Sequence, residues 1–451
     1  MTPLFRFDMG ECPLTLAELR LQNFKCYEHL SVQFDKRLTV IVGSNGAGKT
    51  TILEAAKIAI GTFFTKIDGI SAPCISKEDA RIKAYEMGDS DDVEVQYPVI
   101  VSAQVQTKYD SEYSLVTRSL TNSKGKTTIN EAKKLVDYGN YVQQALRDGD
   151  PTLVIPVVAY YGTGRLWDYH RDKKSSQSGK SVSTRTNGYK DCLDGTANIK
   201  LMMHWFERKT IQSFQKKDEQ ETDFALDAVL SAIGLCFENV SGHKQVKVRF
   251  NFDTKSLEVL YTDSDGRRMR LPFDQLSDGY KGTISLIADI AYRMATLNPQ
   301  LKQDVLRKTP GLVLVDEVDL HLHPAWQKRI LKDLTFIFPK VQFIVTTHAA
   351  SVINSVKKEN LVILKNDLAL GVNSEVYGKD VESVMDEIMG VADRPDDVED
   401  LFKQFYKYLD SLEFEQADRV LGEIGELRGG HDPELAGCQV KLKLAKLRRE
   451  K

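Results

Sequence analysis

The sequence lacks the features of a chain that is exported or that crosses a membrane. None of its uninterrupted apolar runs approaches the roughly 18 residues that a helix needs to span a bilayer. The N-terminal segment has no basic stretch followed by an apolar one, which is the pattern of a secretory signal. We therefore expect a cytoplasmic protein without a membrane partner.

Cysteine is scarce, and a strong charge of one sign is missing. The six cysteines are scattered, with no CxxC pair and no histidine at metal-ligand spacing, which argues against a zinc site and a disulfide framework. The net charge of −3 excludes a global attraction to nucleic acid, although a local basic groove stays open. What remains is a chain of 451 residues, 42% hydrophobic and 28% charged, which is ordinary for a globular protein of one or two domains.

A glycine-rich stretch supplies the strongest signal in the sequence. Residues Gly43–Thr50 fit the pattern G-x4-G-K-[ST] and lie between a predicted strand at Leu38–Val42 and a predicted helix at Thr50–Ile60. In such a P-loop, backbone N–H groups and the helix N-terminus favour phosphate. Lys49 would reach the β- and γ-phosphates of ATP, and the hydroxyl of Thr50 would coordinate Mg²⁺. The residues predicted to bind the nucleotide here are Asn45, Gly46, Gly48, Lys49, Thr50 and Thr51.

Two adjacent carboxylates follow a second apolar strand. Leu312–Val315 is followed directly by Asp316 and Glu317. Asp316 has the position of a Mg²⁺ ligand acting through water, and Glu317 that of the base or orienting group for the attacking water. Taken alone, such a pair could equally be a solvated turn, but its place downstream of a P-loop favours the catalytic interpretation.

Three further motifs complete a family pattern. Leu276–Lys281, which reads LSDGYK, precedes a predicted helix and could in isolation be an ordinary helix cap. Asp319 follows Glu317 by two residues, and His348 follows a predicted strand, where a lone histidine is more often structural. Taken in order, the motifs over residues 14–365 resemble the SMC/Rad50/RecF branch of the ABC-type ATPases.

That resemblance implies roles for the additional residues. Ser277 and Gly279 would bind the γ-phosphate of an ATP held by the opposite protomer, and Asp319 would bridge the two sites. His348 would be the switch histidine that contacts the γ-phosphate. Asn23-Phe24-Lys25 is similar to the N-terminal strand end of that branch, which makes Lys25 a candidate phosphate contact.

One departure and one histidine pair stay open. The branch usually has a glutamine at the end of the strand before the helical insertion, but Leu153–Tyr161 ends without one. Either Gln104 or Gln106 serves instead, or the protein senses ATP differently and hydrolyses it slowly. The pair His321 and His323 could bind metal, but with no third ligand in view a structural or dimer-interface role is preferred.

The expected fold is α/β, an ABC-type ATPase head with a mixed P-loop sheet, an antiparallel β lobe, a short helical insertion and a C-terminal helical tail. The insertion is too short for a long coiled coil. The predicted domains are residues 1–165 and 239–394 for the head, 166–238 for the insertion with a mobile loop at 173–190, and 395–451 for the tail. Other predicted strands are Leu14–Phe24, Leu30–Phe34, Val93–Val105, Tyr113–Leu120, Val246–Phe252, Leu257–Thr262 and Phe343–Thr346. Other predicted helices are Asn198–Gln215, Asp223–Leu235, Gly279–Leu297, Pro324–Phe336, Val398–Leu412, Phe414–Leu427 and Pro433–Arg448.

Three longer runs narrow the resemblance. Val157–Trp167, Glu317–Gln327 and the segment from Ile388 to Pro395 resemble the ATPase subunits of Septu antiviral defence systems, including those linked to retrons. This resemblance implies an ATP-hydrolysing regulatory subunit that forms a homodimer or higher homo-oligomer head to tail around ATP. It also implies a separately encoded HNH nuclease as the partner, for which the helical tail is the expected docking region.

Other functions were weighed against this one. A RecF-like DNA repair ATPase would act on DNA by itself, and a non-hydrolysing scaffold would be indifferent to Glu317→Gln. OLD-family nucleases carry an acidic metal cluster, but the acids at 396–400 lie at one predicted helix start, where they suit the helix dipole, so no nuclease activity of its own is expected. DNA, tRNA or retron RNA–DNA is a candidate nucleic-acid partner, although a solvated loop is the favoured interpretation of the insertion's lysines. The acids are Asp396, Asp397, Glu399 and Asp400, and the lysines are Lys173, Lys174, Lys180 and Lys190.

Overall fold

A six-stranded sheet with the order β15-β14-β3-β13-β12-β8 organises the first of two compact units, Met1–Lys379 and Asp380–Lys451. The computed structural model describes residues 14–87, 90–107, 112–166, 184–195, 199–218, 223–263, 265–385, 388, 396–428 and 433–449. All neighbouring strands of this sheet run parallel except β14 and β15. The strands are β3 (Leu38–Val42), β8 (Val157–Tyr161), β12 (Gly311–Val315), β13 (Val341–Thr347), β14 (Leu361–Lys365) and β15 (Leu368–Gly371).

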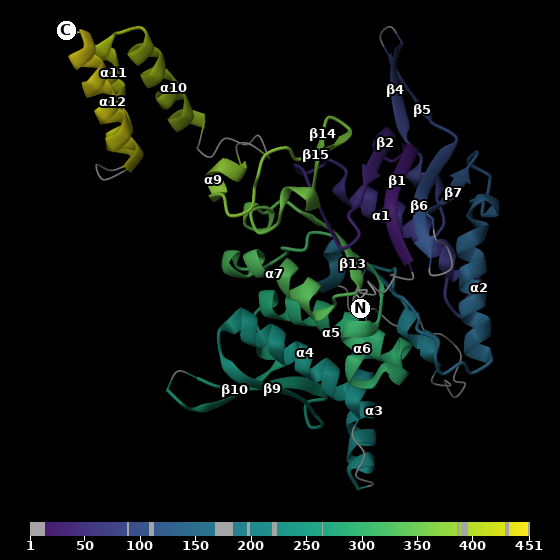
Figure 1. Ribbon diagram of the computed structural model, residues 1–451. Helices are drawn as coiled ribbons and strands as arrows, with labels where there is room; N and C mark the ends of the chain where they lie inside the picture. Colours follow the sequence, from purple (N-terminus) through teal and green to yellow (C-terminus); the bar gives the residue numbers. More distant parts are fainter. Residues whose placement is uncertain are drawn as a thin grey trace, which may run out of the picture. The chain divides into compact units, whose positions relative to one another are not determined.

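Helices cover the parallel sheet, which explains its apolar strands. Every residue of β8, β12 and β13 is buried, as expected for strands covered on both faces. Helix α1 (Lys49–Ile60) contacts β12 and β13, and it also packs against a second sheet (Figure 1). Helix α5 (Asp278–Leu297) packs against β8, and α7 (Pro324–Ile337) is a neighbour of α4 (Phe224–Ser241). The predicted α/β fold with a P-loop sheet is confirmed.

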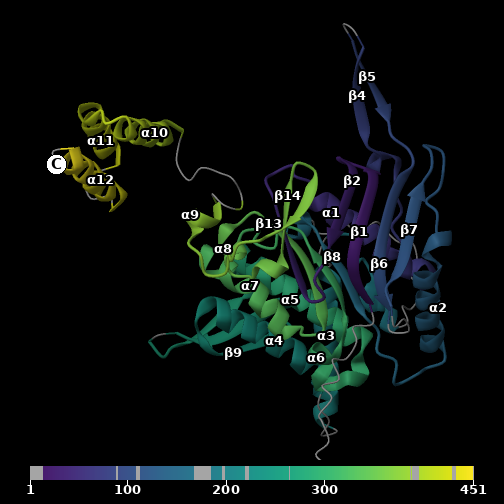
Figure 2. The ribbon, with the colours of Figure 1, turned by 45° about the horizontal axis from the view of Figure 1, so that its top comes forward.

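The second sheet is antiparallel, with the order β2-β1-β6-β7. The single predicted strand Val93–Val105 is wrong: it is divided by Pro98, which has no N–H to donate to a strand ladder. The part before Pro98 joins a separate hairpin, β4–β5, which projects beyond the sheet (Figure 2). The first strand of this hairpin, β4, was not predicted. The strands are β1 (Leu14–Phe24), β2 (Tyr27–Gln33), β4 (Ile82–Met87), β5 (Ser90–Val95), β6 (Val99–Thr107) and β7 (Ser114–Leu120), and α2 (Lys133–Arg147) contacts β7.

The insertion contains the predicted helices α3 (Ile199–Asp218) and α4, followed by a three-stranded sheet. Helix α4 has the length and apolar content of a membrane span, but it packs between α5 and β9, so these side chains belong to a core. The sheet strands are β9 (Lys244–Asn251), β10 (Ser256–Thr262) and β11 (Arg268–Pro272), of which β11 was not predicted.

The predicted loop at 173–190 differs from the structure over its last residues. Arg185–Tyr189 form the short 3-10 helix η5, with Tyr189 fully buried. A β-carbon on Gly188 would lie 2.6 Å from Leu297, so this segment packs closely on α5. Aromatic contacts between Tyr189 and both Phe63 and Phe64 outweigh the polar composition from which we inferred a loop. The rest of that prediction, residues 173–183, lies outside the described residues.

The second unit is a three-helix arrangement with its own apolar core. Its helices are α10 (Asp396–Asp410), α11 (Phe414–Arg428) and α12 (Pro433–Arg449), close to the predicted bounds, and the unit begins at Asp380 rather than at residue 395. Phe405, Ala417, Ile424 and Cys438 are at most 1% exposed within this core. Cys438 is therefore a buried thiol, as are Cys192 and Cys236, whereas Cys26 and Cys74 are exposed.

Candidate functional site

The carboxyl ends of four parallel strands bring the predicted motifs together. The P-loop follows β3, His348 follows β13, Asp316 and Glu317 follow β12, and a short segment ending in Arg165 follows β8. Parallel strands end at the same edge of a sheet, and ligands of open α/β sheets bind at that edge. The fold thus gathers residues that are nearly 300 positions apart in the sequence.

The P-loop has the conformation of an anion cradle. Gly46 and Gly48 have φ angles of +83° and +84°, a region that favours glycine. A β-carbon on Gly48 would lie 2.2 Å from the Oη of Tyr27, whose hydroxyl donates a 2.6 Å hydrogen bond to the carbonyl of Ala47. Gly48 is also the N-cap of α1, so no side chain caps this helix and no acidic residue lies in its first turn. The N-terminal dipole of α1 is therefore available to a phosphate group.

Lys49 is held inside the loop. Its Nζ donates to the carbonyl oxygens of Gly43 (2.7 Å) and Ser44 (3.0 Å), and the residue is 7% exposed. Burial lowers the pKa of Lys49, while the carboxylates of Glu317 and Asp316 act in the opposite direction. The ammonium group of Lys49 thus contacts two P-loop carbonyl groups and feels the carboxylates of the acidic pair after β12.

The side chains of Thr50 and Asp316 meet directly. The Thr50 hydroxyl donates to Asp316 Oδ2 at 2.7 Å, and Thr346 donates to Oδ1 at 2.6 Å. A hydroxyl and a carboxylate are hard oxygen donors of the kind that Mg²⁺ takes alongside phosphate oxygens and water. Among the described residues no group of three or more His, Cys, Asp or Glu could hold a metal by itself. This donor set is therefore too small to hold a cation alone, and it fits one whose remaining ligands are the oxygens of a bound phosphate.

Glu317 lies in a strained backbone conformation. Its φ is +45°, which is rare for a residue with a side chain. Its N–H donates to Thr346 Oγ1 at 2.7 Å, and its carbonyl accepts a 2.7 Å hydrogen bond from Arg165 Nη2. Such strain persists where the surroundings enforce it, and it concentrates at functional sites.

Arg165 is the residue of this site that the sequence analysis missed. It is 6% exposed, and its Nη1 donates to the carbonyl of Asp316 at 2.6 Å. Burial lowers its pKa to about 10, opposed by Asp316, Asp319 and Glu317, so the guanidinium stays charged at neutral pH. Arg165 lies just after β8, the strand before the helical insertion, where the resemblance led us to expect a glutamine. The GTGR sequence after a buried strand was the available signal.

Neither glutamine that was considered lies at this edge. Gln104 and Gln106 pair with Glu18 and Thr15 in the first half of β1. The neighbouring Leu16 N–H bonds Gln342 at the start of β13, which is the amino edge of the parallel sheet. The interpretation in which Gln104 or Gln106 replaces the missing glutamine is therefore wrong.

Replacing Arg165 with alanine is expected to lower the rate of ATP turnover about tenfold or more, because it removes charge-assisted hydrogen bonds to the backbone of both acidic residues. Since Arg165 acts through that backbone, kcat should fall while KM changes little. Steady-state kinetics of wild type, Arg165→Ala and Arg165→Lys check this, with partial rescue expected in the lysine variant. An equal loss in kcat and in affinity for ATP would instead indicate that the whole site is disordered by the substitution.

Asp319 and His348 lie together beside the acidic pair. Asp319 is 4% exposed and accepts a hydrogen bond from the Thr347 hydroxyl, while His348 Nδ1 is 3.9 Å from Asp319 Oδ2. The His348 side chain is 48% exposed, so it stays accessible at the mouth of the site. His323 caps α7 by accepting from the N–H of Ala325, which agrees with the structural interpretation of that histidine.

The segment at Leu276–Lys281 packs against the loop after Asp319 and leaves Ser277 exposed. Ser277 is exposed at the N-cap position of α5, yet its side chain makes no capping hydrogen bond. A β-carbon on Gly279 would lie 2.7 Å from the carbonyl oxygen of His321 and 3.1 Å from the Trp326 ring. This glycine therefore packs α5 against the loop after Asp319, and the hydroxyl of Ser277 is left to solvent.

Two predicted contacts have other partners. Lys25, with a φ of +50°, forms an ion pair with Glu54 of α1 and lies 3.6 Å from Asp79. It therefore reaches α1 but is engaged by two carboxylates. Thr51, on the same turn of α1, bonds the thiol of Cys26.

Comparisons with known proteins identify relatives of this chain. Two AAA-domain family models match the chain, over residues 18–236 and 197–354. The "Retron Ec83 probable ATPase" of Escherichia coli is 27% identical over 96% of this chain and 87% of that protein. The "Septu protein PtuA" of Bacillus thuringiensis is 24% identical over 84% of this chain and 85% of that protein. A solved SMC head domain from Thermotoga maritima aligns with 80% of this chain and all of that one, at 16% identity and a TM-score of 0.42. The chain is therefore a homologue of the retron and Septu ATPases over most of its length.

Proposed function

We propose that the chain is the cytoplasmic ATP-binding and ATP-hydrolysing regulatory subunit of an antiphage defence complex. It dimerises head to tail around ATP and gates a separately encoded HNH nuclease. The observation that carries this proposal is the grouping of Lys49, Thr50, Asp316 and Glu317 at one sheet edge, with Ser277 exposed at the N-terminus of α5. The names of the relatives support the defence context.

Each residue of the edge has a part in this proposal. Lys49 binds the β- and γ-phosphates, together with the loop backbone at Asn45, Gly46 and Gly48 and the first turn of α1 at Thr51. Thr50 and Asp316 hold Mg²⁺, which when bound neutralises charge on the phosphates. Glu317 takes a proton from the attacking water or orients it, and Arg165 fixes the backbone that carries Glu317. His348, accessible beside Asp319, contacts the γ-phosphate, and Lys25 is a reserve phosphate contact once Glu54 releases it.

The site is completed by a second copy of the chain. Ser277 and Gly279 belong to the N-terminus of α5, a helix end that favours anions, and Gly279 packs on the loop that carries Asp319. The two elements therefore form one continuous surface. In the proposed dimer this surface covers the partner's ATP, so that closing follows binding and opening follows hydrolysis.

The C-terminal unit is the proposed dock for the nuclease. On α12, Val440, Leu444 and Leu447 are 58%, 52% and 51% exposed and recur at i, i+4 and i+7. This spacing forms one helix face, while Leu435 and Cys438 on α12 pack into the unit's own core. Such an exposed apolar stripe suits a helix-and-groove contact with another protein.

The function is tested by cleavage assays with the purified chain, alone and with its HNH partner, on plasmid DNA and tRNA, with and without ATP. Cleavage is expected only with the partner present, it should respond to ATP, and Lys49→Ala should abolish that response. A co-purification experiment tests the proposed dock. The variant V440D/L444D should no longer co-purify with the HNH partner, while Q439D/K443D, a matched change on α12, should still do so. Absence of cleavage together with DNA-stimulated ATP turnover by the chain alone would instead support the repair ATPase.

A further inference from the structure

The three-stranded sheet β11-β10-β9 concentrates positive charge in a chain that is acidic overall. Between residues 244 and 270 there are seven lysines and arginines and four acids, a net charge of +3, against −3 for the whole chain. The seven cations are Lys244, Lys247, Arg249, Lys255, Arg267, Arg268 and Arg270. All seven are exposed. A local basic surface of this kind is the electrostatic footprint that polyanions recognise.

Strand register places four of these cations on one face. Arg249 is opposite Glu258, Lys247 and Arg270 are both opposite Leu260, and Arg268 is opposite Thr262. Residues directly opposite one another in an antiparallel pair share a face. The other face holds Val248, Phe250, Leu257 and Val259, all buried. We call the face with Lys247, Arg249, Arg268 and Arg270 the basic face.

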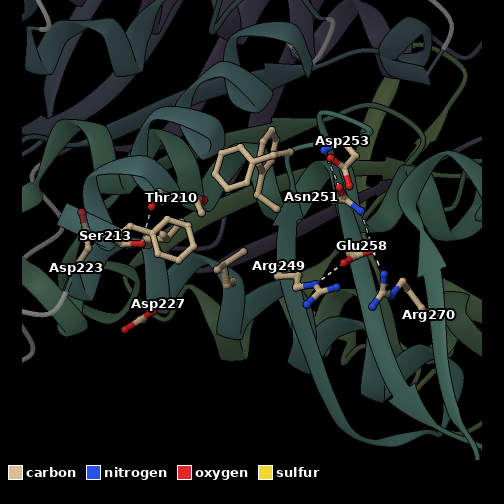
Figure 3. Close-up of a pocket in the computed structure, with 14 residues that line it drawn as sticks. Thr210, Ser213, Asp223, Asp227, Arg249, Asn251, Asp253, Glu258 and Arg270 are labelled. Atoms are coloured by element: carbon tan, nitrogen blue, oxygen red, sulfur yellow. Dashed lines mark hydrogen bonds and ion pairs between the residues drawn. The ribbon is translucent and has the colours of Figure 1, made fainter. Parts of the chain in front are cut away.

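A buried carboxylate orders the two arginines at the centre of the basic face. Glu258 is 2% exposed, although it lies on the outward side of β10. It accepts a hydrogen bond from Arg249 Nε, and Arg270 Nε lies 3.7 Å from its Oε2, while the two arginine side chains are 49% and 60% exposed. Figure 3 shows Glu258 between these arginines. Both contacts use Nε, so Glu258 does not consume the terminal amino groups, which are the groups that fork around phosphate oxygens.

An aromatic pair lies next to the basic face. Phe214 of α3 and Phe252 after β9 are 54% and 40% exposed, and their ring centroids are 6.2 Å apart. Both rings and both arginines line one pocket of about 530 Å³. The helix side of this pocket carries Asp223 and Asp227 (Figure 3), of which Asp223 caps α4 and pairs with Lys209. On the strand side Asp253 also lines the pocket, and Glu258 is engaged by the two arginines. Phosphate is therefore favoured at Arg249 and Arg270, with flat apolar groups on the two rings.

We propose that this surface binds the sugar–phosphate backbone of a single-stranded nucleic acid, with bases stacked on Phe214 and Phe252 and phosphates on Arg249 and Arg270. Exposed bases exist only where a strand is unpaired, and the combination of a basic track with aromatic platforms is what such strands require. A duplex would satisfy the arginines but leave the rings exposed. The proposal is independent of the ATP site, because no residue of the sheet edge takes part.

The test measures fluorescence anisotropy of labelled dT20 and U20 with the full-length chain, without ATP and without the nuclease, over a series of salt concentrations. Wild type is expected to bind one or both strands more tightly than a 20-base-pair duplex. The variant R249Q/R270Q should weaken binding about tenfold and flatten the slope of log K against log salt by about 0.7 for each lost phosphate contact. The variant F214A/F252A should weaken binding about tenfold with the salt slope unchanged, because stacking is not an ionic contact.

Two further variants separate a loss of nucleic-acid contacts from a disturbed sheet and from a general loss of positive charge. K247A/R268A removes basic-face cations that the Glu258 contacts do not use, so it should weaken binding even if R249Q/R270Q disturbs the sheet. R307A/K308A removes two exposed cations elsewhere and should bind as wild type. No binding of either strand by wild type, tighter binding of the duplex, or an equal loss in R307A/K308A would overturn the proposal. Each of these results leaves the ATPase proposal untouched.

Discussion

Replacing Glu317 with glutamine is expected to lower ATP turnover by about 100-fold or more while ATP affinity stays within about threefold of wild type. Glutamine keeps the size of the side chain but cannot accept a proton. The contacts that hold this residue run through its backbone, to Thr346 and Arg165, so the substitution should leave the geometry intact. Single-turnover hydrolysis and equilibrium binding of ATP measure the two quantities separately.

The matched comparison for Glu317→Gln is Lys49→Ala. The lysine variant should lose affinity as well as turnover, because Lys49 is the cation inside the P-loop. In the presence of ATP the glutamine variant should also accumulate as a dimer in size-exclusion chromatography with light scattering, since closed sites could no longer reopen by hydrolysis. Turnover that is unchanged in Glu317→Gln would instead mean a scaffold that holds ATP without using it.

The parts of this site that local pattern dictates could be read from the sequence. Gly46 and Gly48 occupy left-handed conformations that only a glycine-rich loop supplies without strain. The apolar run before Asp316 is buried on both faces, which leaves a strand as its natural structure. Such features need only neighbours in the sequence.

The GTGR run marks the position of Arg165, but its role could not be assigned from the sequence, because its partners are backbone carbonyl groups about 150 positions further along. Because every residue has a backbone carbonyl group, an acceptor of this kind has no signature in the sequence. The same holds for Gln342, which ties β13 to the backbone of Leu16 and Asp35. Strand β4 was missed for a different reason: its apolar residues Ile82 and Tyr85 fall on opposite faces of the strand and both are exposed, so the strand lacks the single apolar face of a half-buried one.

A buried ion pair on α5, the helix whose N-cap is Ser277, joins that helix to the strand that leads to Arg165. Asp289 and Arg293 on α5 are 0% and 1% exposed and bond at 2.7 Å. Asp289 also accepts from the Tyr161 hydroxyl at 2.7 Å, and Arg293 donates to the carbonyl groups of Gly188 and Lys190. Burial alone would lower the pKa of Arg293, but Asp289 beside it raises that pKa overall. The pair therefore holds together three segments that are distant in the sequence.

Replacing Arg293 with methionine is expected to lower the free energy of unfolding by about 3–5 kcal/mol, because Asp289 would remain as a buried and uncompensated charge. Urea denaturation of wild type and variant measures this loss. The double variant D289N/R293M removes the charge as well as the arginine, and asparagine can still accept from Tyr161, so it should recover a large part of the stability. Equal destabilisation of the single and double variants would place the loss in the carbonyl contacts of Gly188 and Lys190 rather than in the charge.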